Sequence, residues 1–104
     1  GKVVDASGLG ARSVISTISA SSVNAATNKR AIINHSLNTL DVIVQLHDTD
    51  TDGTVYAQVT RTSDGGSTQS ADHITVDFGR DIENDVKCII MSAKGGTSKT
   101  PTYA

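Results

Sequence analysis

Apolar and polar residues alternate with a period of two in the segments 41–47, 54–61 and 73–78. This period puts successive side chains on opposite faces of an extended chain, so each segment is predicted to be a strand. A turn rich in aspartate and ending in Gly53 joins the first two segments, which predicts a hairpin over residues 41–61. The residues of the three segments that are predicted to lie in the core are Val42, Val44, Leu46, Val55, Val59, Ile74, Val76 and Phe78.

Four further segments complete the pattern. Short strands are predicted at residues 13–19 and 30–36, and residues 20–29 are predicted to be a polar loop. The segment 86–92, "VKCIIMS", is apolar almost throughout, which is typical of a strand that is covered on both faces. The predicted core adds Ile32, Cys88 and Ile90 to the apolar positions given above.

The chain is rich in Thr, Ser, Val and Ile, and β-branched residues favour strands over helices. We therefore expect an all-β fold, a small antiparallel β-sandwich or barrel with extended N- and C-terminal arms. At 104 residues the chain has the size of one domain. Residues 13–92 are expected to form its core, with an arm at residues 1–12 and a tail at residues 93–104.

Charge and cysteine content exclude several classes of protein. The 11 acidic and 9 basic residues nearly balance, and the basic ones are scattered, which argues against binding nucleic acid. No apolar run reaches the roughly 20 residues that cross a bilayer, and no apolar leader follows a basic start, so we expect a soluble chain without membrane insertion. Cys88 is the only cysteine, so no disulfide forms within the chain, which fits assembly in a reducing cytoplasm.

Three aspartates, Asp48, Asp50 and Asp52, precede Gly53 at the spacing that begins an EF-hand calcium loop. Position 12 of such a loop needs a bidentate Glu, and here it is Val59. The flanking segments also have the period of strands, so we exclude an EF-hand. Two interpretations remain: a β-turn whose side chains bond the local backbone, which we favour, and a different calcium site on the three carboxylates.

Other residues that could carry chemistry do not form a recognisable motif. His35, His47 and His73 are too far apart in sequence for a spaced metal site, and Cys88 lies in an apolar strand where a buried thiol is expected. The serines lack the G-x-S-x-G pattern of a nucleophile elbow. We predict no enzymatic activity and no cofactor.

Ligand contact, if the chain makes any, is predicted to come from the two longest polar connections. These are the turn at residues 48–53 and the loop at residues 63–72, because exposed loops on a rigid scaffold commonly carry recognition. The candidate contact residues are Asp50, Asp52, Gly53, Asp64, Ser67 and Gln69.

The block "NHSLNTLDVIVQLHDTDTDGTVYAQVTRT" followed by "ITVDF" resembles a small β-structured module of tailed-bacteriophage tail-fibre and related virion surface proteins. The similarity covers about residues 30–92. It includes the acidic turn from Asp48 to Gly53, which occupies a variable hairpin turn of that family. The other positions that carry it are His35, Leu37, Thr39, Asp41, Val42, Val44, Gln45, Val55, Arg61, Thr62, Thr75, Val76 and Phe78.

The resemblance implies a non-enzymatic structural protein on the virion surface, assembled in the cytoplasm of the host bacterium. A tail-fibre or receptor-binding type is favoured, a capsid decoration (cement) protein is the alternative, and a cellular β-sandwich binding module is a distant third. The implied partners are other virion proteins, further copies of the chain, with a trimer favoured, and a host surface receptor. Two departures stand out: the loop from Ser63 to Asp72 is longer than the family's, and no fibre shaft or trimerising repeat is present.

Overall fold

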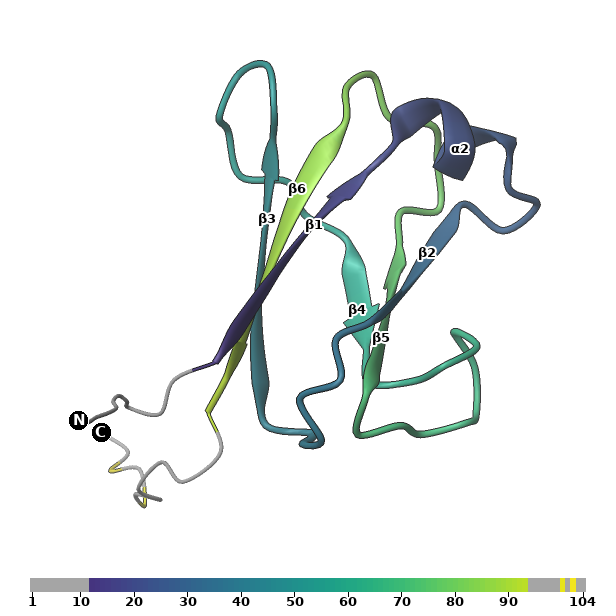
Figure 1. Ribbon diagram of the computed structural model, residues 1–104. Helices are drawn as coiled ribbons and strands as arrows, with labels where there is room; N and C mark the ends of the chain where they lie inside the picture. Colours follow the sequence, from purple (N-terminus) through teal and green to yellow (C-terminus); the bar gives the residue numbers. More distant parts are fainter. Residues whose placement is uncertain (1–11, 94–99, 101, 103–104) are drawn as a thin grey trace.

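The computed structural model describes residues 12–93, 100 and 102. Six strands and one short helix make up this part of the chain, and the strands form two three-stranded antiparallel sheets (Figure 1). The fold is therefore all-β, as the composition predicts. In chain order the elements are β1 (Ser13–Ile18), α2 (Ala20–Ala25), β2 (Arg30–Asn34), β3 (Val42–Asp48), β4 (Gln58–Thr60), β5 (His73–Asp77) and β6 (Val86–Ser92).

The first sheet has the order β1-β6-β3 and the second the order β2-β5-β4. All four strand pairings are antiparallel, and each sheet has its latest strand in the chain at its centre. Side chains from both sheets form a single buried cluster, so neither sheet has a core of its own. The buried apolar residues are Ile18, Val23, Leu37, Val42, Leu46, Ile74, Val76, Phe78, Ile82, Val86, Cys88 and Ile90.

The hairpin predicted over residues 41–61 is wrong in its second half. After the acidic turn the chain stays beside β3 only briefly, through the bridge between His47 and Thr54 and the bond that the Val55 amide donates to the Leu46 carbonyl, 2.9 Å. It then crosses to the other sheet, where β4 pairs with β5. Alternating apolar and polar residues fit a strand in any sheet with one buried face. The pattern in residues 54–61 therefore does not predict which strand they pair with.

Two smaller expectations also need correction. Residues 20–25 form helix α2 rather than a loop; its N-cap is Ser19, whose hydroxyl accepts from the Ser22 amide, and Val23 is its buried residue. Ile32, predicted in the core, is 51% exposed, because β2 turns Ala31 and Ile33 inward instead.

No described helix is long and apolar enough to cross a membrane.

Strand β6 is not covered on both faces. Its inward residues Val86, Cys88 and Ile90 are buried, but Met91 on the opposite face is 41% exposed. The outer face of its sheet is open in the described structure. Most of the expected N-terminal arm, residues 1–11, and most of the expected C-terminal tail lie outside the described residues.

The connector from β2 to β3, residues 35–41, carries the chain from one sheet to the other. Its backbone is tied to the segment before β5: the amide of His35 donates to the Asp72 carbonyl, 2.8 Å, and that of Thr39 donates to the Ala71 carbonyl, 2.9 Å. The Asn38 amide donates to the Asp72 carboxylate, 2.9 Å. Backbone groups that leave a strand need such partners, and these bonds tie the connector to the segment before β5.

Two arginines secure the connector from outside. The Arg12 guanidinium donates to the Leu37 carbonyl, 2.7 Å. The Arg61 guanidinium donates to the carbonyls of Leu40, 3.3 Å, and Val42, 2.8 Å. Segments that lie far apart in the sequence thereby meet at one end of the molecule.

Candidate functional site

The acidic turn at the end of β3 is organised by Asp48. One oxygen of its carboxylate accepts from the amides of Asp50, 2.7 Å, and Thr51, 3.0 Å, and the other accepts from the Asn84 side chain, 3.1 Å. These bonds, chiefly the one from Thr51, lower the pKa of Asp48 below its usual value. Asp52 has a left-handed backbone with φ of 61°. This is the arrangement in which side chains bond the local backbone.

The turn lies beside the loop that leads into β6. Thr49 donates through both its amide, 3.0 Å, and its hydroxyl, 2.9 Å, to the Asp85 carbonyl. Asp50, Glu83 and Asp85 line a shallow polar depression there. Within the described residues, no group of three or more His, Cys, Asp or Glu side chains is arranged to hold a metal ion. Asp48, Asp50 and Asp52 are not gathered into a cage.

The loop from residue 61 to residue 72 folds back onto the outer face of the sheet β2-β5-β4. The hydroxyl of Thr75, a residue of β5 that is 1% exposed, donates to the Thr62 carbonyl, 3.0 Å, and accepts from the Thr62 hydroxyl, 3.2 Å. The Gly65 amide donates to the Thr62 hydroxyl, 3.0 Å. The base of the loop thus covers a sheet face that would otherwise meet water.

The predicted contact residues of this loop have unequal roles. The Asp64 carboxylate accepts from the amides of Gly66, 2.9 Å, and Thr68, 3.2 Å. The bond from Gly66 is the main reason why the pKa of Asp64 is lowered. Gln69 forms a bridge with Thr62. Ser67 is exposed at the tip of the loop.

The structure does not bring the two predicted binding loops together. The turn with Asp50, Asp52 and Gly53 follows the end of β3, whereas the loop with Asp64, Ser67 and Gln69 lies near the connector that leads into the start of β3. They are at opposite ends of the molecule (Figure 1). They cannot form one contact surface within a single copy of the chain.

His35 is buried in the connector, with 3% of its surface exposed. Its Nδ1 accepts from the Leu37 amide, 3.0 Å, so the neutral ring carries its proton on Nε2. Nε2 is buried and has no hydrogen-bond partner among the described residues. Burial lowers the pKa of His35, the Asp72 carboxylate opposes that effect, and His73 adds to it.

The other candidate groups are held in structural roles. The Ser70 hydroxyl contacts Nδ1 of His73, 2.8 Å, but also accepts from the Asp72 amide, 3.2 Å, so this Ser–His contact closes a turn. His47 lies on the outer face of the other sheet, opposite Lys87. Burial raises the pKa of Cys88 to about 11, which keeps it in the unreactive thiol form.

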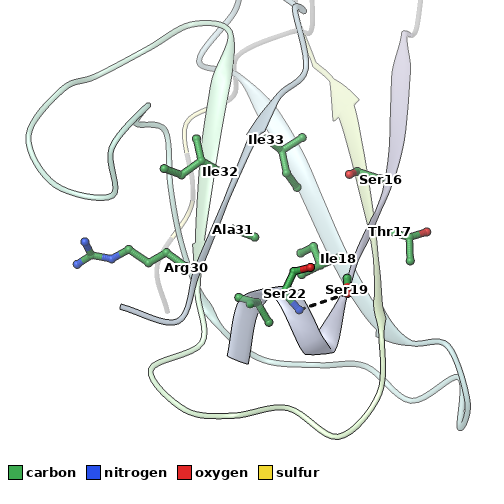
Figure 2. Close-up of a pocket in the computed structure, with 10 residues that line it drawn as sticks. Ser16, Thr17, Ile18, Ser19, Ser22, Arg30, Ala31, Ile32 and Ile33 are labelled. Carbon is green, nitrogen blue, oxygen red and sulfur yellow. Dashed lines mark hydrogen bonds between the residues drawn. The ribbon is translucent and has the colours of Figure 1, made fainter. Parts of the chain in front are cut away.

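A groove lies between the edge strands β1 and β2 and is closed at one end by α2 (Figure 2). Ile18, Ala31 and Ile33 point toward the space between the strands, while Ile32 and Arg30 point away (Figure 2). The Arg30 guanidinium is paired with the Asp77 carboxylate, 3.1 Å. The groove is therefore apolar with a rim of serine hydroxyls, and it presents no reactive group.

Sequence reasoning missed the exposed apolar face of the sheet β1-β6-β3. Ile15 is 64% exposed and Ile43 is 58% exposed, and both lie on the same outer face as Met91. The signal was present in the continuous apolar run of β6, which we interpreted as a strand covered on both faces within the chain.

Comparisons with protein-family models, with curated proteins and with solved structures found no match. The similarity to virion surface modules therefore stays a prediction from the residues that carry it.

The packing of the long loop on its sheet predicts different effects for its two glycines. Gly65 has φ of 77°, and a Cβ there would lie 2.8 Å from Cδ of Arg30 and 3.1 Å from Cγ2 of Thr75. Gly65→Ala should therefore lower the free energy of unfolding by about 1 kcal/mol or more. Gly66→Ala is the matched control and should stay within about 0.5 kcal/mol of wild type, because its Cβ would meet only Asp64 Oδ1 at 3.8 Å. Urea denaturation measures both, and equal stability of the two variants would refute the packing.

The buried histidine predicts that stability falls in mild acid. The pKa of His35 is below 6.5 in the folded protein and ordinary in the unfolded chain, which binds more protons between these two values. Stability is therefore lost as pH falls from about 6.5 through the folded pKa. The melting temperature should drop between about pH 7.5 and pH 5.5.

His35→Asn keeps an acceptor for the Leu37 amide and removes the titrating ring, so this variant should lose most of that pH slope. His47→Asn is the control, since His47 is outside the connector, and in dilute, monomeric protein it should keep the wild-type slope. A His35→Asn protein with an unchanged slope would show that His35 does not cause the effect.

Proposed function

We propose that this chain is a non-enzymatic structural protein on the surface of a bacteriophage particle, assembled in the bacterial cytoplasm and attached to other virion proteins. The observation that carries the proposal is the open apolar face of the sheet β1-β6-β3, with Ile15, Ile43 and Met91 exposed together. Apolar patches of this kind are typical of surfaces that dock onto other protein chains, further copies of the same chain included.

The roles of the chemistry-bearing side chains support a structural function. Asp48 and Asp64 bond backbone amides within turns, Cys88 is buried as a thiol, and His35 belongs to the connector between the sheets. In the described chain, groups with shifted pKa values are thus each explained by folding. An active site would instead place perturbed groups together in a cleft.

Three of the residues that resemble the virion modules have a shared structural role. His35 and Thr39 fix the connector, and Arg61 donates to the Leu40 carbonyl of the connector and to the Val42 carbonyl at the start of β3. Modules with different surface loops can share the sequence pattern that specifies such a crossover. The resemblance at these residues therefore supports the proposal that the chain belongs to the virion class. Within that class, the tail-fibre type remains the first form of the proposal.

Capsid decoration is the second form, and one observation favours it. A receptor-binding protein needs its recognition loops on one exposed surface, whereas the turn at Asp50 and the loop at Ser67 lie at opposite ends of this molecule (Figure 1). A decoration protein needs only a face that docks and a compact, stable body.

Location in the particle tests the proposal. Mass spectrometry of purified particles should detect the chain, and an electron-microscopy map should place it on the exterior. Density on the tail indicates the fibre type, and density at repeated positions of the capsid lattice indicates decoration. Absence of the chain from purified particles would contradict both forms.

Two exposed substitutions separate the forms by a second route. Asp50→Arg and Ser67→Arg change the two ends of the molecule without removing a side-chain bond seen in the structure. At least one should reduce adsorption to host cells if the protein is of the fibre type. Neither should do so if it decorates the capsid.

A further inference from the structure

On the outer face of the sheet β1-β6-β3, two adjacent rows are apolar at two of their three positions. Strand register places Ile15 beside Ile89 in one row, with Gln45 as the third member, and Met91 beside Ile43 in the next, with Ser13 as the third member. Helix α2 closes the space between the sheets, and the long loop lies beside the other sheet, so neither covers these rows (Figure 1).

The other sheet shows how this protein treats an outer face when its own chain is to cover it. There the loop from residue 61 to residue 72 lies over β5, and Thr75 is 1% exposed. Ile32, at the edge of that sheet, is the large apolar residue left exposed on that face. The apolar outer positions of β6, in contrast, have no cover from the described chain.

Charged residues flank the apolar rows with opposite sign. The row beyond Ile15 and Ile89 has Lys87 on the central strand β6, with His47 beside it on β3. Asp41 lies at the other end of these rows, just before β3. It is two residues from Ile43, which places the two side chains on the same face of the extended chain. The Asp41 carbonyl accepts from the Ala93 amide, 2.7 Å. Neither Asp41 nor Lys87 belongs to an ion pair within the described residues.

We propose that a second copy of this chain covers this face. The β1-β6-β3 sheets of the two copies pack against each other, and the twofold axis lies between them and runs perpendicular to their strands. A twofold interface uses the same patch on both copies, so the patch must be complementary to itself. An axis through the level of Val44 and Ile90 meets this condition. It places the row with Ile15 over the partner's row with Ile43 and Met91, and it brings His47 and Lys87 toward the partner's Asp41.

Charge selects this axis over the alternative one. A twofold axis parallel to the strands would also pair the apolar rows, but it would put Lys87 against its own copy in the partner. Like charges across an interface are unfavourable, and opposite charges fix its orientation. Aligned packing of two sheets at about 30° keeps these rows in contact.

The inference rests on the proposed function, in which the open face docks onto another protein chain, and it names a second copy as that chain. It predicts a dimer from this face; the trimer implied by the resemblance would need a second surface. The two proposals fail separately. A monomeric protein found in virions would overturn only the inference, and a dimer absent from particles would overturn only the function.

Sedimentation equilibrium of the purified chain tests the interface from about 1 µM to about 500 µM, a range that brackets the weak affinity of a small contact. We expect a monomer–dimer equilibrium. Ile43→Lys should raise the dissociation constant at least about tenfold. Ile32→Lys, an equally apolar and similarly exposed strand residue on the other sheet, is the matched control and should leave it unchanged.

Charge reversal tests the orientation. Asp41→Lys should weaken association, and adding Lys87→Asp to it should restore association to within about threefold of wild type, because opposite charges then face each other again. Melting temperatures near that of wild type would show that each variant is folded.

Three results would overturn the inference: a wild-type protein that stays monomeric over the whole range, equal effects of Ile43→Lys and Ile32→Lys, or a double charge variant no better than Asp41→Lys. A second copy is the committed occupant, so a monomer that binds a different virion protein through Ile43 also counts against it.

Discussion

The two sheets share one core, and the connector between β2 and β3 must therefore pass from one to the other with its backbone polar groups satisfied. His35, Asn38 and Thr39 meet this constraint by donating their amides to Ala71 and Asp72. The left-handed backbones of Ser36 and Asn38, with φ of 55° and 54°, are part of the same arrangement. Non-glycine residues adopt this conformation at a cost, which the surrounding hydrogen bonds offset.

This constraint places the remaining parts of the molecule. Fixing the connector against residues 70–72 fixes the end of the long loop, whose base then lies across the outer face of β2-β5-β4 through Thr62 and Thr75. The acidic turn is left at the opposite end, held by Asp48. The outer face of β1-β6-β3 keeps Ile15, Ile43 and Met91 exposed in the described structure, and it is the face that we propose for docking.

Sequence patterns predicted the all-β class and the positions of most strands, because a period of two reports which residues lie on a buried face. They did not predict strand pairing. Val55 and Val59 fit an inward face of either sheet, and the crossing after Val55 depends on tertiary contacts. The six-residue helix α2 has one buried side chain, Val23, so no apolar stripe announced it. In Arg30–Asn34 both faces of the strand carry apolar residues. The pattern therefore did not decide whether Ile32 or Ile33 faces the core.

The candidate site was predicted less well than the fold. The capping of local amides by Asp48 and Asp64 follows from the chemistry of short acidic side chains in turns. Their distance from each other, and the burial of Thr75 beneath the long loop, depend on the packing of segments distant in sequence. An apolar run such as that of β6 predicts a strand covered on both faces, whereas the outer face of β6 has no cover from the described chain. The pattern does not say whether a second chain supplies it.

Hydrogen exchange at the connector tests most directly that this crossover holds the two sheets together. The amides of His35 and Thr39 should exchange as slowly as those of the central strand β6, since their bonds to Asp72 and Ala71 continue the pairing of β2 with β5 into the crossover. The exposed amide of Ser67 provides the reference for a loop. Exchange of His35 and Thr39 at a rate close to that of Ser67 would contradict the account.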